Sequence, residues 1–128
     1  MEWVTEVGCA YDAVITVGTE GALTTNEIVV DIQFKDYAGN NLKEPVNFYG
    51  YCCVSSDGLV KETNTNSSET IIETYGNLEI ELAKTSYNLI TNATGHIDLS
   101  MIDTGSNSYY FCVVLPNGRL KVSKVITF

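Results

Sequence analysis

The chain contains one histidine, His96, so acid–base chemistry that depends on an imidazole has to use this residue. In a nucleophilic hydrolase the histidine takes a proton from a serine or cysteine held in a sharp turn, and the sequence has no such nucleophile motif. His96 follows Thr94-Gly95 at the start of a β-rich run. We therefore interpret it as a surface residue of a strand and assign it no catalytic role.

Paired carboxylates are the other groups whose spacing suggests chemistry. Glu79 and Glu81 share one face of a predicted strand, as the acid and base of a glycosidase would, but on a solvent-facing strand such pairs usually only add charge. The sequence has neither the acidic spacing of a calcium loop nor a glycine-rich phosphate loop. We predict that the protein is not an enzyme and has no catalytic residue, metal ligand or cofactor.

The chain of 128 residues carries a net charge of −9, which argues against nucleic acid and anionic membrane surfaces as partners because both would repel it. Three of its seven basic residues fall in the final β-rich run, at Arg119, Lys121 and Lys124, whereas residues 1–34 contain none. This run is either a solvated strand face or a contact surface for a protein. With Trp3, the only tryptophan, these three residues are our candidate partner-contact residues.

The N-terminal residues 1–6 have neither the basic nor the apolar region of a secretory signal, and no apolar run in the sequence has transmembrane length. We therefore expect the protein to be made in the cytosol and to leave it only by a route such as cell lysis. Because the cytosol is reducing, this expectation also bears on the cysteines.

The chain has four cysteines without the spacing or the histidine neighbours of a zinc site: Cys9, Cys52, Cys53 and Cys112. Tyr110 precedes Cys112 by two residues, which is the spacing around a bridged cysteine of immunoglobulin domains. Because side chains alternate along a strand, at most one of Cys52 and Cys53 can face Cys112 across a core. We expect reduced thiols, with one immunoglobulin-type bridge as the alternative.

Short β-rich runs and turn-forming residues alternate along the chain, and no run has a convincing helical period. Many short strands at this spacing predict a sandwich or a barrel made by a single domain, 1–128, in which residues 1–12 form an N-terminal arm. The predicted strands cover 13–17, 27–35, 46–54, 59–62, 70–74, 77–84, 86–91, 96–102, 109–115 and 119–127.

Two runs show the alternation of a half-buried antiparallel strand. In 27–35 the apolar residues Ile28, Val30, Ile32 and Phe34 share one face. In the final run, Leu120 and Val122 should share a face with Lys124, opposite Arg119, Lys121, Ser123 and Val125.

Two dipeptides predict hairpin turns. Asn117-Gly118 should join 109–115 to 119–127 as an antiparallel pair, with Gly118 at positive φ. Asp57-Gly58 should form the turn of a hairpin that pairs Tyr51–Val54 with 59–61.

Two segments carry a resemblance to known proteins. The turn Asp36–Asn41 followed by Pro45-Val46 resembles that of bacterial Ig-like domains of the invasin type. More closely, the C-terminal segment resembles that of small virion proteins of tailed bacteriophages, which combine a Leu-Pro-Asn-Gly hairpin with a last strand of Val-Ser-x-x-Ile-x-Phe type. The matching positions are Leu115, Pro116, Asn117, Gly118, Val122, Ser123, Ile126 and Phe128.

The resemblance covers about 36–54 and 91–128 and implies an all-β, Ig-like antiparallel β-sandwich. It implies a non-enzymatic structural protein of the virion, made in the host cytoplasm, that decorates the capsid and binds the major capsid protein or another virion protein. A dimer or trimer would suit such a role. The alternatives are a tail or neck component of the virion and a bacterial adhesin-type Ig-like binding module.

Overall fold

The computed structural model describes residues 10–19, 27–59, 70–73, 77–82, 86–103 and 108–128. Within these ranges the chain forms strands and turns without a helix, and all strand pairs are antiparallel, which confirms the predicted all-β class. The strands are β1 (Asp12–Val17), β2 (Glu27–Lys35), β3 (Asn47–Cys53), β4 (Thr70–Glu73), β5 (Asn77–Leu82), β6 (Ser86–Ile90), β7 (His96–Ile102), β8 (Ser108–Val114), β9 (Leu120–Val122) and β10 (Ile126–Thr127).

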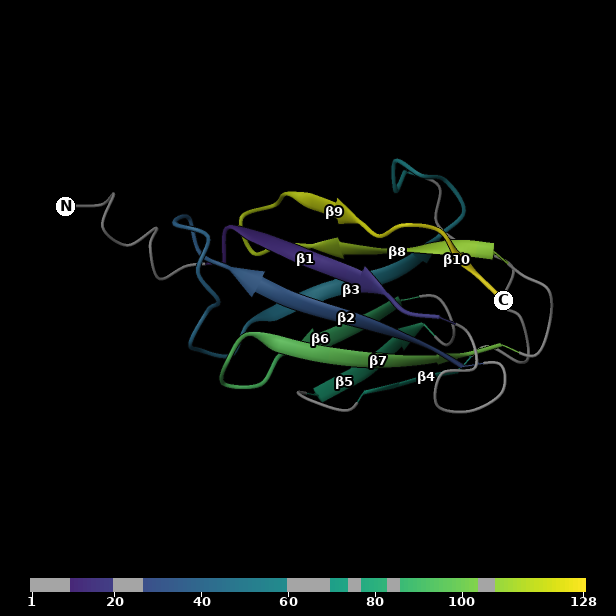
Figure 1. Ribbon diagram of the computed structural model, residues 1–128, viewed down its shortest axis with the longest axis horizontal. Helices are drawn as coiled ribbons and strands as arrows, with labels where there is room; N and C mark the ends of the chain where they lie inside the picture. The colour runs from purple at the N-terminus through teal and green to yellow at the C-terminus, as the bar shows by residue number, and fades with distance from the viewer. Residues whose placement is uncertain (1–9, 20–26, 60–69, 74–76, 83–85, 104–107) are drawn as a thin grey trace.

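These strands form two sheets that pack as a β-sandwich (Figure 1). One sheet has the strand order β1-β2-β7-β4. The other has the order β10-β8-β3-β6-β5, and β9 pairs with β8 as well. Strands 27–35 and 96–102, which the sequence predicted with these bounds, lie side by side in the first sheet as β2 and β7.

The core lies between the sheets and is built from the inward-facing residues of both. On β2, Ile28, Val30, Ile32 and Phe34 are all buried, as their alternation predicted. The ring of Phe34 meets that of Phe48 on β3, with 4.8 Å between the centroids. Burying a side chain of this size contributes about 1.5–3 kcal/mol, so these contacts hold the two sheets together.

The Asn117-Gly118 turn joins β8 to β9, as predicted. The amide of Gly118 donates to the carbonyl of Leu115 at 2.9 Å, and the amide of Leu115 donates to the carbonyl of Arg119 at 2.9 Å. Gly118 has φ 86°, a conformation that glycine adopts without steric cost. The turn is therefore a three-residue hairpin loop that ends on a left-handed residue.

The last β-rich run is not the single strand that alternation predicted. Val122 pairs with Cys112, and Ile126 pairs with Tyr109, so three residues of the last run lie opposite two residues of β8. This extra residue is a β-bulge, and a one-residue shift moves every following side chain to the other face. Ile126 is therefore buried in the core, whereas Val122 lies on the outer face beside Cys112.

Ser123 holds the bulge in place by bonding twice to Phe111. Its amide donates to the carbonyl of Phe111 at 2.9 Å, and its hydroxyl oxygen accepts from the amide of Phe111 at 3.0 Å. The predicted common face of Ser123 and Val125 is thus wrong, because Ser123 is buried and Val125 is exposed. A side-chain hydroxyl competes here with the regular ladder, and this competition is not visible in the apolar pattern.

The Asp57-Gly58 turn forms, with the amide of Gly58 donating to the carbonyl of Ser55 at 3.1 Å. The phenol of Tyr51 donates to the carbonyl of Gly58 at 2.7 Å, which holds the turn over the outer face of β3. Leu59 lies outside any strand, and the rest of the expected strand 59–62 lies outside the described residues. The prediction of a hairpin at this turn therefore stays a prediction.

The expectation that all cysteines are reduced is wrong, because Cys53 and Cys112 form a disulfide. The immunoglobulin-type alternative is wrong as well, since both cysteines belong to one sheet, on the adjacent strands β3 and β8. Alternation along β3 sends the side chain of Cys52 into the core and leaves Cys53 on the outer face. Which strands are neighbours decides the bridge, and spacing alone does not contain that information.

Candidate functional site

The residues expected to contact a partner lie in different settings. Trp3 falls outside the described residues. Arg119 lies just after the Asn117-Gly118 turn, Lys121 is in β9, and Lys124 is exposed between β9 and β10. Arg119 and Lys121 both reach the beginning of β1.

Arg119 contacts Tyr11, the residue that precedes β1. The Nη1 atom of Arg119 donates to the carbonyl of Tyr11 at 3.2 Å, and its guanidinium carbon lies 4.8 Å from the centroid of the Tyr11 ring. Asn117 donates to the same carbonyl at 3.3 Å. The Tyr11 ring also meets Tyr37 edge to face, with 4.9 Å between centroids. Part of the basic run thus attaches the first strand to the β8–β9 hairpin.

The prediction of an N-terminal arm over residues 1–12 is wrong for residues 10–12. The amide of Tyr11 donates to the carbonyl of Lys35 at 2.9 Å, which extends the β1–β2 ladder by one residue. Ala10 packs against the core cluster. Residues 10–12 belong to the sandwich, and the remainder of the expected arm lies outside the described residues.

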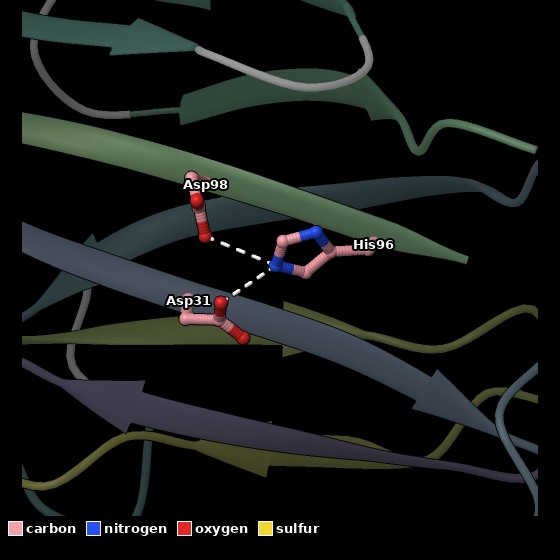
Figure 2. Close-up of side chains that lie close together, drawn as sticks. All are labelled: Asp31, His96 and Asp98. Atoms are coloured by element: carbon pink, nitrogen blue, oxygen red, sulfur yellow. Dashed lines mark hydrogen bonds and ion pairs between the residues drawn. The ribbon is translucent and has the colours of Figure 1, made fainter. Parts of the chain in front are cut away.

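A second group of side chains is the strongest candidate for a site. It consists of His96 and Asp98 on β7 and Asp31 on β2, which lie on the outer face of the β1-β2-β7-β4 sheet (Figure 2). Asp31 and Asp98 are directly opposite each other in the antiparallel register. His96 is two residues before Asp98, so alternation places both on the same face. Figure 2 shows the imidazole Nε2 atom aimed between the two carboxylates.

The three side chains of this group differ in their contact distances and in their exposure. Nε2 of His96 is 2.6 Å from Oδ2 of Asp31 and 3.1 Å from Oδ1 of Asp98. The side chain of Asp31 is 41% exposed, whereas those of His96 and Asp98 are 22% and 20% exposed. The single N–H bond at Nε2 of His96 can point at only one acceptor, and the shorter contact indicates that this acceptor is Asp31. The Oδ1 atom of Asp98 is buried and has no hydrogen-bond partner.

The pKa values of the group reflect this crowding. Burial lowers the pKa of His96, but the hydrogen bond to Asp31 and the charges of both carboxylates outweigh burial, so the pKa lies above its ordinary value. Burial raises the pKa of Asp98, and the nearby carboxyl of Asp31 raises it further, against the opposing effect of His96. Both effects favour a proton on Asp98, and such a proton is one means of relieving the repulsion between the two carboxylates.

The sequence pattern indicated only a strand-surface position for His96, and this interpretation missed the group. His96 does lie on a strand, but it is mostly buried and bonded to a residue 65 positions away. The spacing His96-x-Asp98 was the one local signal, because residues two apart share a strand face. The sequence does not show that Asp31 belongs to the same group, because the register of β2 against β7 is decided by the tertiary structure.

Comparison of the chain with models of known protein families, with curated proteins and with solved structures finds no match. In the described part of the chain, no helix is long and apolar enough to span a membrane.

Proposed function

We propose that this protein is a non-enzymatic structural component of a tailed-phage virion, and that it decorates the capsid by binding the major capsid protein. The main support is where the two resembling segments lie. They are far apart in the sequence, yet β3 from the first pairs with β8 from the second, from Tyr49 opposite Val114 to Cys53 opposite Tyr110. The resemblance therefore covers the central strand pair of one sheet and its terminal hairpin.

Strand order supports the Ig-like part of this proposal and also limits it. Immunoglobulin domains order one sheet A-B-E-D and place C, F and G in the other. The orders β1-β2-β7-β4 and β3-β8-β9/β10 follow that scheme. The departure is the β5–β6 pair, which follows β4 in the chain but lies beside β3.

The partner would bind at strand edges and exposed loop residues rather than in a deep pocket. The path of each sheet ends in an edge strand, at β1 and β4 in one sheet and at β5 and β10 in the other. Unpaired edges attract further strands, so a virion protein or a second copy of the chain would cover them. Tyr37 and Leu59 are 61% and 77% exposed and offer apolar contacts at loop positions.

Mass spectrometry of purified virions tests the proposal directly. Decoration predicts this chain in the particle at a copy number comparable to that of the major capsid protein. A small number of copies would instead support a tail or neck component. Absence of the chain from the particle would contradict a virion role and favour an adhesin-type binding module.

An add-back experiment tests capsid binding without relying on copy number. Particles assembled without this chain should bind the purified protein until their surface is saturated, and cryo-electron microscopy should show density on the outer shell. Tails separated from capsids are the matched control and should bind none. Binding to tails alone would overturn capsid decoration.

A further inference from the structure

The outer face of the β1-β2-β7-β4 sheet holds a buried acceptor without a donor. Oδ1 of Asp98 has no hydrogen-bond partner, although it points toward His96 and the carboxylate of Asp31 (Figure 2). A buried carboxylate oxygen without a donor is costly, so native structures normally supply a proton, a water or a cation. The chemistry of its neighbours indicates which of these fits.

We propose that Asp31, His96 and Asp98 form a binding site for one divalent transition-metal ion of the zinc class. The ligands would be one carboxylate oxygen from each aspartate and Nε2 of His96. These three atoms already lie within 4.8 Å of one another. Two carboxylates and a neutral imidazole carry a charge of −2, which a divalent ion neutralises. This inference does not depend on the proposed virion role.

The donor set selects the class of metal. Calcium takes six or more oxygens and magnesium keeps an octahedral, largely hydrated shell, so three protein ligands with one imidazole suit neither. Zinc and cobalt accept imidazole nitrogen and carboxylate oxygen in a four-coordinate site. With three protein ligands, the fourth position is left for water or for a group from another molecule.

The distances need only a small adjustment to admit such an ion. Metal–ligand bonds of about 2.0–2.2 Å at tetrahedral angles separate neighbouring ligand atoms by roughly 3.4 Å. The contact between His96 and Asp98 is 3.1 Å, close to that spacing. The contact between His96 and Asp31 is 2.6 Å and must open. Asp31 is the most exposed of the three side chains, so rotation about its side-chain bonds can open it.

The backbone around the site is held rigidly, which lowers the entropy cost of binding. The seven paired positions of β2 and β7 fix Asp31 opposite Asp98. The amide of His96 donates to the side chain of Asn92 at 3.1 Å, and the amide of Asn92 donates to the carbonyl of His96 at 3.0 Å. Gln33, opposite His96 in the register, donates to the carbonyl of Thr94 at 2.8 Å.

The single histidine makes the test direct. In a nuclear magnetic resonance titration of the whole chain with ZnCl₂, all imidazole signals come from His96. We expect these signals to shift and to saturate at one equivalent of zinc. Unchanged imidazole signals in excess zinc would overturn the proposal, even if calorimetry detected heat from binding elsewhere.

Variants identify the ligands. Asp98→Asn and His96→Gln should each weaken zinc binding, measured by calorimetry, by at least about tenfold. Loss of a residue that only supports a metal ligand already lowers metal affinity by about that factor. Asp12→Asn, which removes a carboxylate from the same sheet outside the group, should leave the affinity unchanged. Equal affinities for native protein and Asp98→Asn, or an equal loss in Asp12→Asn, would contradict the site.

Cobalt absorption spectra distinguish metal binding at this site from metal binding at the cysteines. The Co²⁺ complex of the native protein should show the visible bands of nitrogen and oxygen ligation without thiolate charge-transfer absorption. Thiolate absorption would assign the metal to a cysteine and overturn the proposal. This measurement uses native protein, so it decides the matter even if a variant fails to fold.

Discussion

At the scale of single residues, Asp12 shows how charge joins the two ends of the described chain. Its carboxylate lies 3.3 Å from Nζ of Lys121 and accepts a hydrogen bond from the amide of Ala13 at 2.8 Å. Burial raises the pKa of Asp12, but these hydrogen bonds and the charges of Lys121 and Arg119 outweigh burial, so the pKa lies below its ordinary value of 3.8. The ion pair therefore stabilises β1 against β9.

The pH dependence of that stabilisation is our first prediction. Because the folded pKa of Asp12 is depressed, its contribution is present above the unfolded value of 3.8 and is lost as pH falls through the folded pKa. Asp12→Asn should lower the free energy of unfolding at neutral pH by up to about 1 kcal/mol, since the pair is partly exposed. Urea unfolding should show this difference vanishing in strong acid.

Lys121→Met is the matched control for the ion pair. It should lower the free energy of unfolding at neutral pH by a similar amount and should show the same loss of effect in acid. A difference between native protein and Asp12→Asn that is equal at neutral and acid pH would contradict the assigned role.

At the scale of elements, the β8–β9 hairpin depends on one backbone conformation. Gly118 has φ 86°, and a Cβ added there would touch nothing within 4 Å, so a substitution would meet backbone strain and no crowding. Gly118→Val should cost about 1 kcal/mol or more in free energy of unfolding. Gly118→Asn should cost less, because asparagine tolerates this conformation better. Equal thermal melting of all three proteins would rule out the turn geometry.

The disulfide between β3 and β8 gives the second prediction at this scale. Alkylation of the unfolded protein without reductant should leave Cys53 and Cys112 unlabelled, and peptide mass spectrometry should find label on both only after reduction. Label on both before reduction would contradict the bridge. Replacing Cys53 and Cys112 together by serine should cost about 2–4 kcal/mol, because a loop between positions 59 apart is no longer closed in the unfolded chain.

At the scale of the whole molecule, packing on the core face of the β10-β8-β3-β6-β5 sheet limits the size of side chain that a strand can carry. Gly50 lies in β3 beneath the ring of Phe111, and a Cβ added there would be 2.6 Å from Cζ of that ring. It would also be 3.0 Å from a methyl group of Leu89. The aromatic ring thus fills the space that a β3 side chain would otherwise occupy.

Gly50→Ala should therefore overpack the core and lower the free energy of unfolding by about 1–3 kcal/mol, measured in urea. Combining it with Phe111→Leu should give a smaller loss than the sum of the two single changes, since the smaller side chain makes room. Additive losses would show that Phe111 does not crowd position 50.

The sequence by itself determined the all-β class, the bounds of some strands, the Asn117-Gly118 turn and the core face of β2. The bounds of β2 and β7, the buried face from Ile28 to Phe34 and the left-handed Gly118 were all predictable, because strand alternation and turn chemistry act between near neighbours in the chain. The bulge at Ser123 was not, since it depends on a hydrogen bond to another strand.

Only the tertiary structure decided the disulfide and the His96 group. Cys53 meets Cys112 because β3 and β8 are neighbours, and Asp31 meets His96 because β2 pairs with β7 in one particular register. Both contacts join residues about sixty positions apart. Their formation follows from how the two sheets bury their apolar faces together, and a local pattern of residue types records nothing about that choice of partner strand.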